Sequence, residues 1–164
     1  MIIRRTPWSD PGAMALRDAM RMEIEARYGT ADAEPGPVPT ALDITAFFVA
    51  YDDSDRPVGC GALRELPGND AEVKRMFVAS SHRGTGVSSA ILLELERFGR
   101  ERAWSRLVLE TGDRQPDAVR FYEREGFTRI PNFAYYADSE HSLCFEKTLF
   151  AVDPAGEVDC EGCQ

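Results

Sequence analysis

The chain has 164 residues, of which 43% are hydrophobic and 29% charged, and it carries a formal net charge of -9 at pH 7. This length predicts one globular domain with a core large enough to fold without disulfide bonds. The acidic balance argues against a nucleic-acid partner, and the lack of a run of ~18 apolar residues argues against a membrane span. The N-terminal residues MIIRRTPWSDP lack the apolar segment of a signal peptide, so we expect a cytoplasmic protein without a membrane partner.

Residues 151–164 differ in composition from the preceding chain. They contain four acidic residues and no Lys or Arg, and we expect a flexible acidic tail after a single domain at 1–150. Cys160 and Cys163 form a CxxC pair in this tail, but neither a second such pair nor two histidines at zinc-finger spacing accompany it. No metal site is therefore predicted.

The N-terminal part of the chain predicts a short strand and an amphipathic helix. Ile2 and Ile3 start the strand. Asp10 and Pro11 then supply an N-cap and a proline at the first helical position, and Gly29 ends the helix. Apolar residues recur at spacings of three and four, so one face of the helix is predicted to be apolar. These residues are Ala13, Leu16, Met20, Ile24 and Tyr28.

A loop and a hairpin are predicted next. The segment Thr30–Thr40 contains three prolines and one glycine and has no periodicity. It indicates a surface loop that either borders a binding site or is a plain connector. Ile44–Tyr51 is β-branched and aromatic, and Val58–Leu63 is a second apolar run after the turn sequence DDSDRP. The two runs predict a β-hairpin.

The rest of the chain is arranged around the stretch from Glu72 to Phe98. An apolar-rich strand at Val73–Val78 leads into a loop with the sequence RGTG at 83–86, and a helical pattern begins directly after the second glycine. A helix N-terminus offers unpaired N–H groups and a partial positive charge, and glycines let a ligand approach the backbone closely. This order of strand, glycine loop and helix predicts an anion-binding site.

The helix after the glycine loop is predicted to pack on a sheet. Its apolar stripe includes Val87 and Leu95, and its charged residues, Glu96 among them, are expected to face water. A further strand at Ser105–Glu110 is expected to run parallel to Val73–Val78, because a helix separates the two. The three consecutive strands at Ile44–Tyr51, Val58–Leu63 and Val73–Val78 are joined by short turns and predict an antiparallel meander.

Residues 115–127 predict a second short helix near the C-terminal end. Pro116 takes the first helical position, and Gly126 lies just past the end. Ala118 and Tyr122 are four residues apart and share one face of this helix. The small residue leaves space beside the tyrosine for a thin, long ligand. Two final strands are expected at Phe127–Ile130 and Leu143–Leu149.

Two of these segments together resemble the GNAT superfamily of N-acetyltransferases. Val78 followed by Arg83–Val87 is similar to the family's pyrophosphate-binding motif, in which a polar residue precedes two glycines. Gln115–Phe127 is similar to the family's helix in which an alanine precedes a tyrosine by four residues. The resemblance covers roughly residues 2 to 150 and rests on two motifs in the right order on the predicted elements.

The resemblance implies an α+β fold with a central mixed, mostly antiparallel sheet, a splayed pair of parallel strands, and helices on both faces. It implies acetyl-CoA as the co-substrate, bound in the opening between the parallel strands, and no metal. The strand before the glycine loop, the loop amides and the later helix would contact the pantetheine and the pyrophosphate. The residues concerned are Met76, Phe77, Val78, Arg83, Gly84, Thr85, Gly86, Val87, Ser88, Gln115, Ala118 and Phe121.

The resemblance also implies that Tyr122 is the general acid that protonates the leaving thiolate of coenzyme A. A phenol with a pKa of about 10 can deliver a proton to a thiolate with a pKa of about 8.5 as it leaves. Ser81, Ser88 and Gln115 depart from the residues that are frequent at their motif positions. Because the phosphate site relies on backbone donors, these departures are expected to weaken affinity rather than abolish binding.

The general base is less determined than the acid. Glu72 lies at the start of the glycine-loop strand, where some family members place a catalytic glutamate. Strand alternation would put it on the face of Lys74, Met76 and Val78, unless a bulge shifts the register. Glu110, at the end of the next strand, and a water molecule are the alternatives.

Two histidines and an aromatic cluster have no fixed role in this scheme. His82 lies in the glycine loop and is interpreted as facing solvent or lying near the phosphate, whereas His141 lies in a polar turn; neither is interpreted as the base. Phe133, Tyr135 and Tyr136 either line an acceptor pocket or belong to the core.

The sequence therefore predicts an enzyme that transfers acetyl from acetyl-CoA to a primary amine by direct attack in a ternary complex. No covalent intermediate is expected, because Cys60 and Cys144 lie in apolar runs and have no predicted partner base. The alternative is a sensor or regulatory module that binds acyl-CoA without turnover, and the presence of Tyr122 favours the enzyme. No motif encodes the acceptor, a small molecule or a peptide, and the oligomeric state, a homodimer included, stays open.

Overall fold

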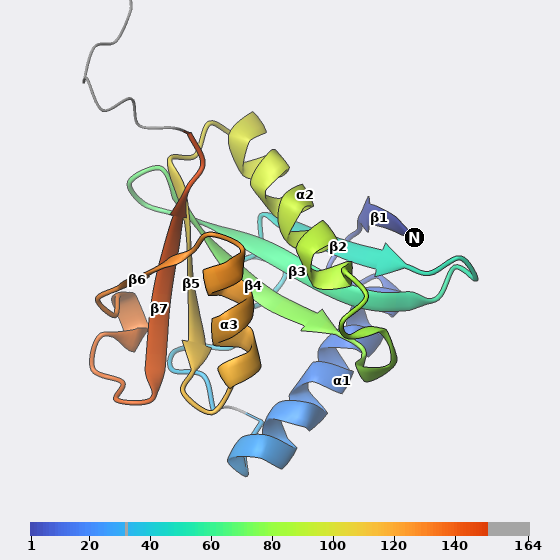
Figure 1. Ribbon diagram of the computed structural model, residues 1–164, viewed down its shortest axis with the longest axis horizontal. Helices are drawn as coiled ribbons and strands as arrows, with labels where there is room; N and C mark the ends of the chain where they lie inside the picture. The colour runs from blue at the N-terminus through green and yellow to red at the C-terminus, as the bar shows by residue number, and fades with distance from the viewer. Residues whose placement is uncertain (32, 151–164) are drawn as a thin grey trace, which may run out of the picture.

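The computed structural model describes residues 1–31 and 33–150, so the predicted tail at 151–164 lies outside the described residues. The described chain forms one seven-stranded sheet in the order β1-β2-β3-β4-β5-β7-β6 with helices packed against it (Figure 1). The strands are β1 (Ile2–Arg5), β2 (Ala46–Tyr51), β3 (Pro57–Leu66), β4 (Asp70–Val78), β5 (Arg106–Gly112), β6 (Thr128–Ile130) and β7 (Ser142–Thr148). The helices are α1 (Pro11–Tyr28), α2 (Val87–Glu101) and α3 (Pro116–Arg124), with 3-10 turns at Ser80–His82 and Ala134–Tyr136.

β2, β3 and β4 are antiparallel neighbours in chain order, which confirms the predicted meander of three strands, and β1 pairs with the outer edge of β2. The turn between β3 and β4 is tighter than expected, because β3 continues to Leu66 and β4 begins at Asp70. Gly68 and Asn69 make this turn with φ angles of 81° and 64°. Residues with positive φ are typical of short hairpin connections, so Pro67, Gly68 and Asn69 are enough to join the paired residues Leu66 and Asp70.

Strands β4 and β5 run parallel, as predicted, but their pairing is short. It joins only Asp70–Glu72 to Arg106–Val108, although β4 continues to Val78 and β5 to Gly112. Beyond Glu72 the two strands diverge (Figure 1), while β5 stays paired with β7 along its length. The splayed parallel pair is confirmed, and from Val73 onward one edge of β4 has no strand partner among the described residues.

A β-bulge interrupts β4 just beyond this short pairing. Arg75 and Met76 together oppose the single residue Gly61 of β3. Arg75 has a φ of 55°, in the left-handed region that a non-glycine residue rarely adopts. An extra residue of this kind reverses the alternation of side chains along the strand that contains it.

The bulge changes which β4 side chains share a face. Glu72 and Lys74 precede it, and Phe77, which follows it, packs on the same face in the small core under α1. Met76 and Val78 pack instead against the larger core under α2. The expectation from simple alternation, that Met76 and Val78 share the face of Glu72, is therefore wrong, and the extra residue at the bulge is the reason.

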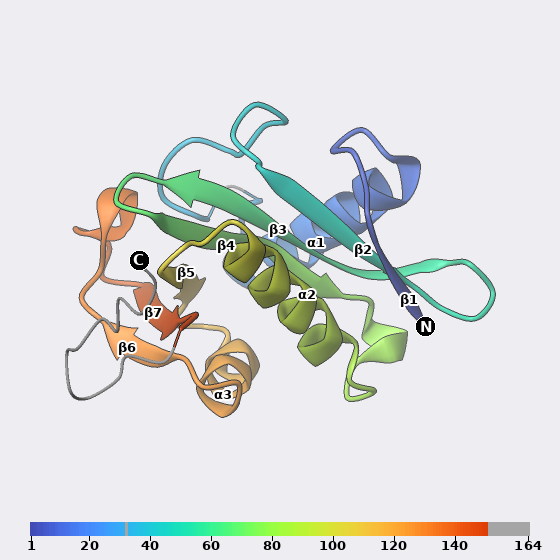
Figure 2. The same cartoon turned by 90° about the horizontal axis from the view of Figure 1, so that it is seen from above.

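Helices cover both faces of the sheet, as expected from the resemblance. α1 lies on one face, and α2 and α3 lie on the other (Figure 2). The predicted caps of α1 are confirmed: the Asp10 carboxylate accepts a hydrogen bond of 3.0 Å from the Ala13 amide, and Gly29 has a φ of 77°. No helix among residues 1–31 and 33–150 is long and apolar enough to cross a membrane.

The larger core lies between the sheet and α2. Gly59 and Gly61 of β3 let the helix approach closely, because a Cβ at Gly61 would lie 2.8 Å from Ile91 Cγ2. Cys60 and Cys144 are buried free thiols, which confirms their interpretation as small hydrophobes. Burial raises the pKa of Cys60 to about 12, so this thiol is unreactive at neutral pH.

One charged residue of α2 lies in the core rather than in water. Glu96 is 5% exposed and forms ion pairs with Lys147 at 2.6 Å and with Arg100 at 3.2 Å. The prediction that Glu96 faces water is wrong, because Lys147 of β7 supplies a cation at the helix surface that the sequence pattern of α2 alone could not reveal.

Candidate active site

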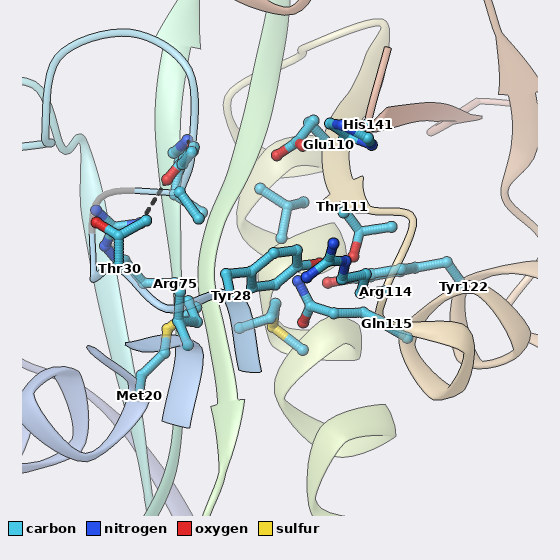
Figure 3. A pocket seen from close by; sticks show the side chains of 18 residues that line it. Met20, Tyr28, Thr30, Arg75, Glu110, Thr111, Arg114, Gln115, Tyr122 and His141 are labelled. Carbon is cyan, nitrogen blue, oxygen red and sulfur yellow. Dashed lines mark hydrogen bonds and ion pairs between the residues drawn. The ribbon is translucent and has the colours of Figure 1, made fainter. Parts of the chain in front are cut away.

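Two adjacent cavities open where β4 and β5 diverge. The larger has a volume of about 370 Å³ and the smaller about 180 Å³. The larger is bounded by α1, the loop after it, β4, the end of β5 and α3 (Figure 3). The smaller lies toward the glycine loop and includes Arg83 in its lining. Five residues line both cavities, namely Met20, Ile24, Met76, Gln115 and Ala118.

The apolar face of α1 serves both the core and the larger cavity. Ala13 and Leu16 are buried against the sheet, as the periodicity predicts. Met20, Ile24 and Tyr28 continue the same stripe but line the larger cavity. The sequence pattern therefore identified the apolar face of α1 correctly. The residues of this face in the last two turns of α1 line the cavity instead of the core.

Tyr28 closes one side of the larger cavity. Its hydroxyl is buried and has no hydrogen-bond partner among the described residues. Arg114 lies over its ring at 5.7 Å, and Figure 3 shows Tyr28, Arg114 and Gln115 directed toward one another. A side chain at Gly112 would overlap the hydroxyl, so the glycine allows α1 to approach the end of β5.

The glycine loop has the geometry of an anion-binding site. Gly84 and Gly86 have φ angles of 73° and 86°, and no atom lies within 4 Å of a Cβ placed on either. The backbone N–H groups from Gly84 to Ser88 donate to no backbone carbonyl of the described chain. Unpaired donors at the start of a helix, beside open space, fit the pyrophosphate of coenzyme A.

Arg83 ties this loop to the neighbouring elements. Its Nε donates a hydrogen bond of 3.0 Å to the Val78 carbonyl, and its guanidinium pairs with Glu23 of α1 at 2.5 Å. Phe77, Val78 and Arg83 together line the smaller cavity. The predicted pantetheine-binding strand and the predicted phosphate loop thus meet at one cavity.

Tyr122 of α3 lines the larger cavity and is 7% exposed. Its ring packs against Phe121 and Phe127, with centroid distances of 5.1 and 5.5 Å. Burial, with a smaller contribution from Glu110, raises the pKa of Tyr122 well above its ordinary value. The phenol therefore stays protonated at neutral pH and can donate a proton into the cavity.

Glu72 lies outside the lining of both cavities. It is 1% exposed, accepts a hydrogen bond of 2.6 Å from the Tyr136 hydroxyl, and pairs with Arg64 at 2.5 Å and with Lys74 at 3.4 Å. Its carboxylate is thus engaged on several sides within a buried network. Such a residue can anchor Lys74 and Tyr136, but it does not face the space where a substrate would lie.

Lys74 connects this network to the larger cavity. It is 6% exposed and lines the cavity. Burial and repulsion from Arg75 lower the pKa of Lys74 to about 7, and the charge of Glu110 opposes this shift. The amine also forms ion pairs with Glu34 and Glu72. The amine is therefore held in place by two acids rather than free to move in the cavity.

Glu110, the second candidate base of the sequence, does line the larger cavity. It lies on β5 beyond the point where the pairing with β4 ends. Burial raises the pKa of Glu110, while a hydrogen bond with Ser142 and the charge of Lys74 oppose the shift. The position is open to a substrate, unlike that of Glu72.

His141 reaches the rim of the larger cavity, although the sequence places it in a polar turn. Its Nδ1 lies 2.9 Å from Asp113 Oδ2, and this contact orients the imidazole ring. His82, in contrast, lines neither cavity and contacts Ser81. An imidazole held by a carboxylate beside a cavity is a common arrangement for a general base.

The aromatic cluster after α3 supports the network rather than lining the cavity. Tyr136 is 1% exposed, and Phe133 packs against it with a centroid distance of 5.3 Å. Tyr135 is largely exposed and lies beside Gly36 of the loop after α1. Of the two alternatives for this cluster, membership of the core is the correct one for Tyr136. The loop after α1, in contrast, borders the larger cavity through Ala33 and Glu34.

Of the predicted cofactor residues, about half line a cavity. Val87 is instead buried in the larger core, and Phe121 packs against this core. Gly84, Thr85, Gly86 and Ser88 form the loop beside the smaller cavity without lining it. The residues that line one cavity or both are Met76, Phe77, Val78, Arg83, Gln115 and Ala118.

A sheet that opens between two parallel strands, unpaired loop amides at one end of the opening and a buried phenol at the other define the class of acyl-CoA-dependent acyltransferases. The sequence profile of the acetyltransferase (GNAT) family matches residues 16–127. The chain belongs to this family, as the two sequence motifs predicted. Within residues 1–31 and 33–150 no cluster of His, Cys, Asp and Glu could hold a metal ion.

Curated relatives support the same class. The chain is 34% identical over 99 residues to YsnE of Bacillus subtilis, an uncharacterised N-acetyltransferase, a match that covers 59% of this chain and 66% of the relative. It is 36% identical over 103 residues to an IAA acetyltransferase of Azospirillum brasilense, covering 62% of this chain and 67% of the relative. The chain thus spans about two thirds of the length of these relatives.

Solved structures share the fold over almost the whole chain. A structure from Klebsiella pneumoniae, named provisionally as an acyl-CoA N-acyltransferase, has a TM-score of 0.78 and 28% identity and covers 91% of this chain and 97% of its own. An aminoglycoside 6'-N-acetyltransferase in complex with coenzyme A has a TM-score of 0.69 and 18% identity, with coverage of 93% and 99%. The second likeness concerns the fold alone.

Proposed function

We propose that this protein transfers acetyl from acetyl-CoA to a primary amine by direct attack in a ternary complex. The observation that carries the proposal is the position of Tyr122, a buried, protonated phenol on the larger cavity, which adjoins the smaller cavity beside the glycine loop. Bound acetyl-CoA supplies a thioester whose carbonyl carbon accepts the amine. The loop amides at 84–88 would hold its pyrophosphate, and Met76, Phe77 and Val78 its pantetheine.

In this proposal Tyr122 gives its proton to the thiol sulfur as the carbon–sulfur bond breaks. His141 takes the proton that the amine nitrogen loses as its bond to the acetyl carbon forms, directly or through one water. Asp113 holds the imidazole in place through the contact between its Oδ2 and the Nδ1 of His141. The proton count balances, because one proton leaves the amine and one reaches the thiol.

Glu110 is the second candidate base, and Glu72 becomes a positioning residue in this proposal. Glu110 shares the cavity with Tyr122, and burial raises its pKa toward the range that suits a base. Glu72 is enclosed by Arg64, Lys74 and Tyr136, so it acts on the site through them. Its catalytic role, expected from the resemblance, stays a prediction that the variants below address.

The experiment for the reaction is a panel of primary amines incubated with acetyl-CoA and the full chain, with free thiol as the readout. We expect thiol release that depends on at least one amine. A Gly86→Val variant, which strains the loop and fills the space before the amides, is expected to lose acetyl-CoA binding. Tight binding of acetyl-CoA without acetylation of any amine in a broad panel would overturn the proposal in favour of a sensor.

The assignment of the base is tested by pH profiles of kcat/KM for His141→Asn and Glu110→Gln. A base must be unprotonated, so wild-type kcat/KM should fall as the pH drops below the pKa of that base. We expect His141→Asn to remove this acidic limb and Glu110→Gln to retain it. The reverse result would assign the role to Glu110, and loss of the limb only in Glu72→Gln would restore Glu72.

The type of acceptor, the cellular location and the oligomeric state also belong to the proposal. The acceptor is a small molecule or a peptide with a primary amine, and the cytoplasm and a homodimer remain predictions from the sequence. Size-exclusion chromatography with light scattering decides the oligomeric state directly.

A further inference from the structure

The larger cavity is lined by three Lys or Arg side chains and two carboxylates, although the protein is acidic overall. The formal net charge of the chain is -9, yet Lys74, Arg75 and Arg114 all line this cavity. The acids in the same lining are Glu34 and Glu110, and burial raises the pKa of Glu110, which favours its neutral form. Burial lowers the pKa of Lys74 to about 7, so Arg75 and Arg114 supply the permanent positive charge of this lining, to which an anionic group of a ligand would be attracted.

Arg75 is the least expected of these cations. It follows directly from the bulge in β4, where its φ of 55° turns the strand away from regular alternation. Its side chain is 15% exposed, and its one ion pair among the described residues is with Glu34, at 2.8 Å. A guanidinium removed from water needs a carboxylate partner, and its planar fork suits that group.

Glu34 supplies this carboxylate from a loop rather than from a helix or strand. It belongs to the connection between α1 and β2, which contains three prolines. Its two oxygens contact Arg75, Lys74 and the hydroxyl of Tyr136, the last at 3.0 Å. The side chain of Glu34 is 28% exposed, so it can leave toward solvent.

Tyr136 already has another acceptor. Its hydroxyl donates to Glu72 at 2.6 Å, and a hydroxyl carries one proton only. Departure of Glu34 would therefore leave Tyr136 and Lys74 with Glu72 as their partner, whereas Arg75 would have no anion among the described residues. The position that Glu34 occupies is thus a preformed carboxylate site.

We propose that the acceptor is a small amine that also carries a carboxylate, and that this carboxylate replaces Glu34 on Arg75. Arg114, which forms no ion pair among the described residues, faces the same cavity and adds a second cation for the acceptor. The inference deepens the proposed N-acetyltransferase function and rests on it. It names a substrate class, the amino acids and related amino carboxylates.

The size of the cavity suits this class. A volume of about 370 Å³ is at the low end of small-molecule sites, which span roughly 300–1,000 Å³. Met20 and Ile24 add apolar surface to the same lining, against which an acceptor side chain would lie. An amino acid with an apolar side chain would therefore place its carboxylate at Arg75 and its remaining surface on α1.

The test compares matched acceptors that differ in one charge. Methionine, phenylalanine, alanine and serine are each paired with their C-terminal amide, and kcat/KM is measured with acetyl-CoA and the full chain. A readout that needs no turnover is the binding of the N-acetylated acids and of their amides to the protein with coenzyme A, by calorimetry. We expect the acid of at least one pair to be favoured about tenfold or more in both measurements, equivalent to ~1.4 kcal/mol.

Four variants locate this preference. Arg75→Gln and Arg114→Gln should each reduce the ratio of acid to amide by about tenfold. Glu34→Gln, which removes the competing charge, should tighten acid binding several-fold and leave amide binding unchanged. Arg124→Gln is the matched control, because Arg124 is exposed and lines neither cavity. Testing two cavity arginines keeps the inference falsifiable if one variant fails to fold.

The outcomes separate the two proposals. Acetylation of amides or polyamines with no preference for acids would overturn the carboxylate inference and leave the N-acetyltransferase proposal intact. Selective binding of acids with no acetylation of any amine would overturn the acetyltransferase proposal and retain the carboxylate site. A preference for acids that Arg75→Gln and Arg114→Gln leave unchanged would place the carboxylate elsewhere and overturn the inference.

Discussion

At the scale of single residues, the chemistry proposed for Tyr122 depends on its burial as much as on its place in the motif. Replacement by phenylalanine keeps the ring contacts with Phe121 and Phe127 and removes only the proton donor. We expect Tyr122→Phe to lower kcat about 10²-fold, with acetyl-CoA affinity nearly unchanged. The measurements are thiol release under saturating substrates and calorimetry with acetyl-CoA. Full retention of kcat would exclude Tyr122 as the general acid.

Glu110 makes the stability of the fold depend on pH in a predictable direction. Burial raises its pKa in the folded protein above the ordinary 4.5. As the pH rises through the window from 4.5 to the raised pKa, the folded protein keeps a proton that the unfolded chain releases, so the wild type loses stability across that window. Glu110→Gln does not titrate and should gain stability relative to the wild type as the pH rises.

Urea unfolding of both proteins between pH 4 and pH 8 measures this difference. The stability difference between Glu110→Gln and wild type should increase with pH and then become constant. Glu123→Gln serves as the control, because Glu123 is exposed, and its difference from wild type should not vary with pH in this way. Parallel stability curves for Glu110→Gln and wild type would contradict the burial-driven shift.

Among individual residues, those that belong to local motifs could be predicted and those that meet through the fold could not. The spacing of Ala118 and Tyr122 and the glycines of the loop identify half of the site, because a helix turn and a left-handed loop are local properties. Arg75 and His141 gave no such signal. They reach one cavity only because the bulge in β4 and the turn before β7 bring them there.

At the scale of elements, α1 packs against the sheet at its N-terminal end and lines the larger cavity at its C-terminal end, and its N-cap stabilises the whole helix. The Asp10 carboxylate caps the helix whose far end carries Met20, Ile24 and Tyr28 into the cavity. We expect Asp10→Ala to lower the free energy of unfolding by about 1 kcal/mol and Asp10→Asn to change it by only a few tenths, since asparagine keeps the acceptor oxygen. Urea unfolding measures both, and equal losses in the two variants would show that the cap itself does not matter.

The elements themselves were largely predictable, because their signals are short in range. The caps of α1, the meander and the parallel β4–β5 pair follow from cap residues, turn residues and the intervening helix. Two features were not predictable. The bulge at Arg75 depends on pairing with β3, and the burial of Glu96 depends on Lys147 in a strand that follows much later in the chain.

At the scale of the whole molecule, the sheet consists of two groups of strands with a short junction. β1 to β4 form one group and β5, β7 and β6 form the other, and in the described part of the chain the strand pairing between the groups is limited to Asp70–Glu72 with Arg106–Val108. A ligand in the opening would contact both groups and so restrict their relative motion. Binding to the folded state alone adds stability that grows with the ratio of ligand concentration to Kd.

Hydrogen exchange with and without acetyl-CoA tests this view. We expect slower exchange at 76–78 of β4, at 84–88 of the glycine loop and at the start of α3, by up to about 100-fold when the ligand is present at ~100 times its Kd. The β1–β2 pair, on the far side of the sheet, is the internal control and should change little. Protection confined to one group of strands would contradict binding between the two.

The bulge in β4 also determines how this chain can be compared with other sequences. Before Arg75 the even-numbered residues of β4 face α1, whereas after Arg75 the even-numbered residues face α2. A sequence alignment that places a gap elsewhere in β4 would equate residues under α1 with residues under α2. Deletion of Arg75 would therefore remove the extra residue and leave a regularly alternating strand, in which Met76 and Val78 still lie beneath α2 and Phe77 still lies beneath α1.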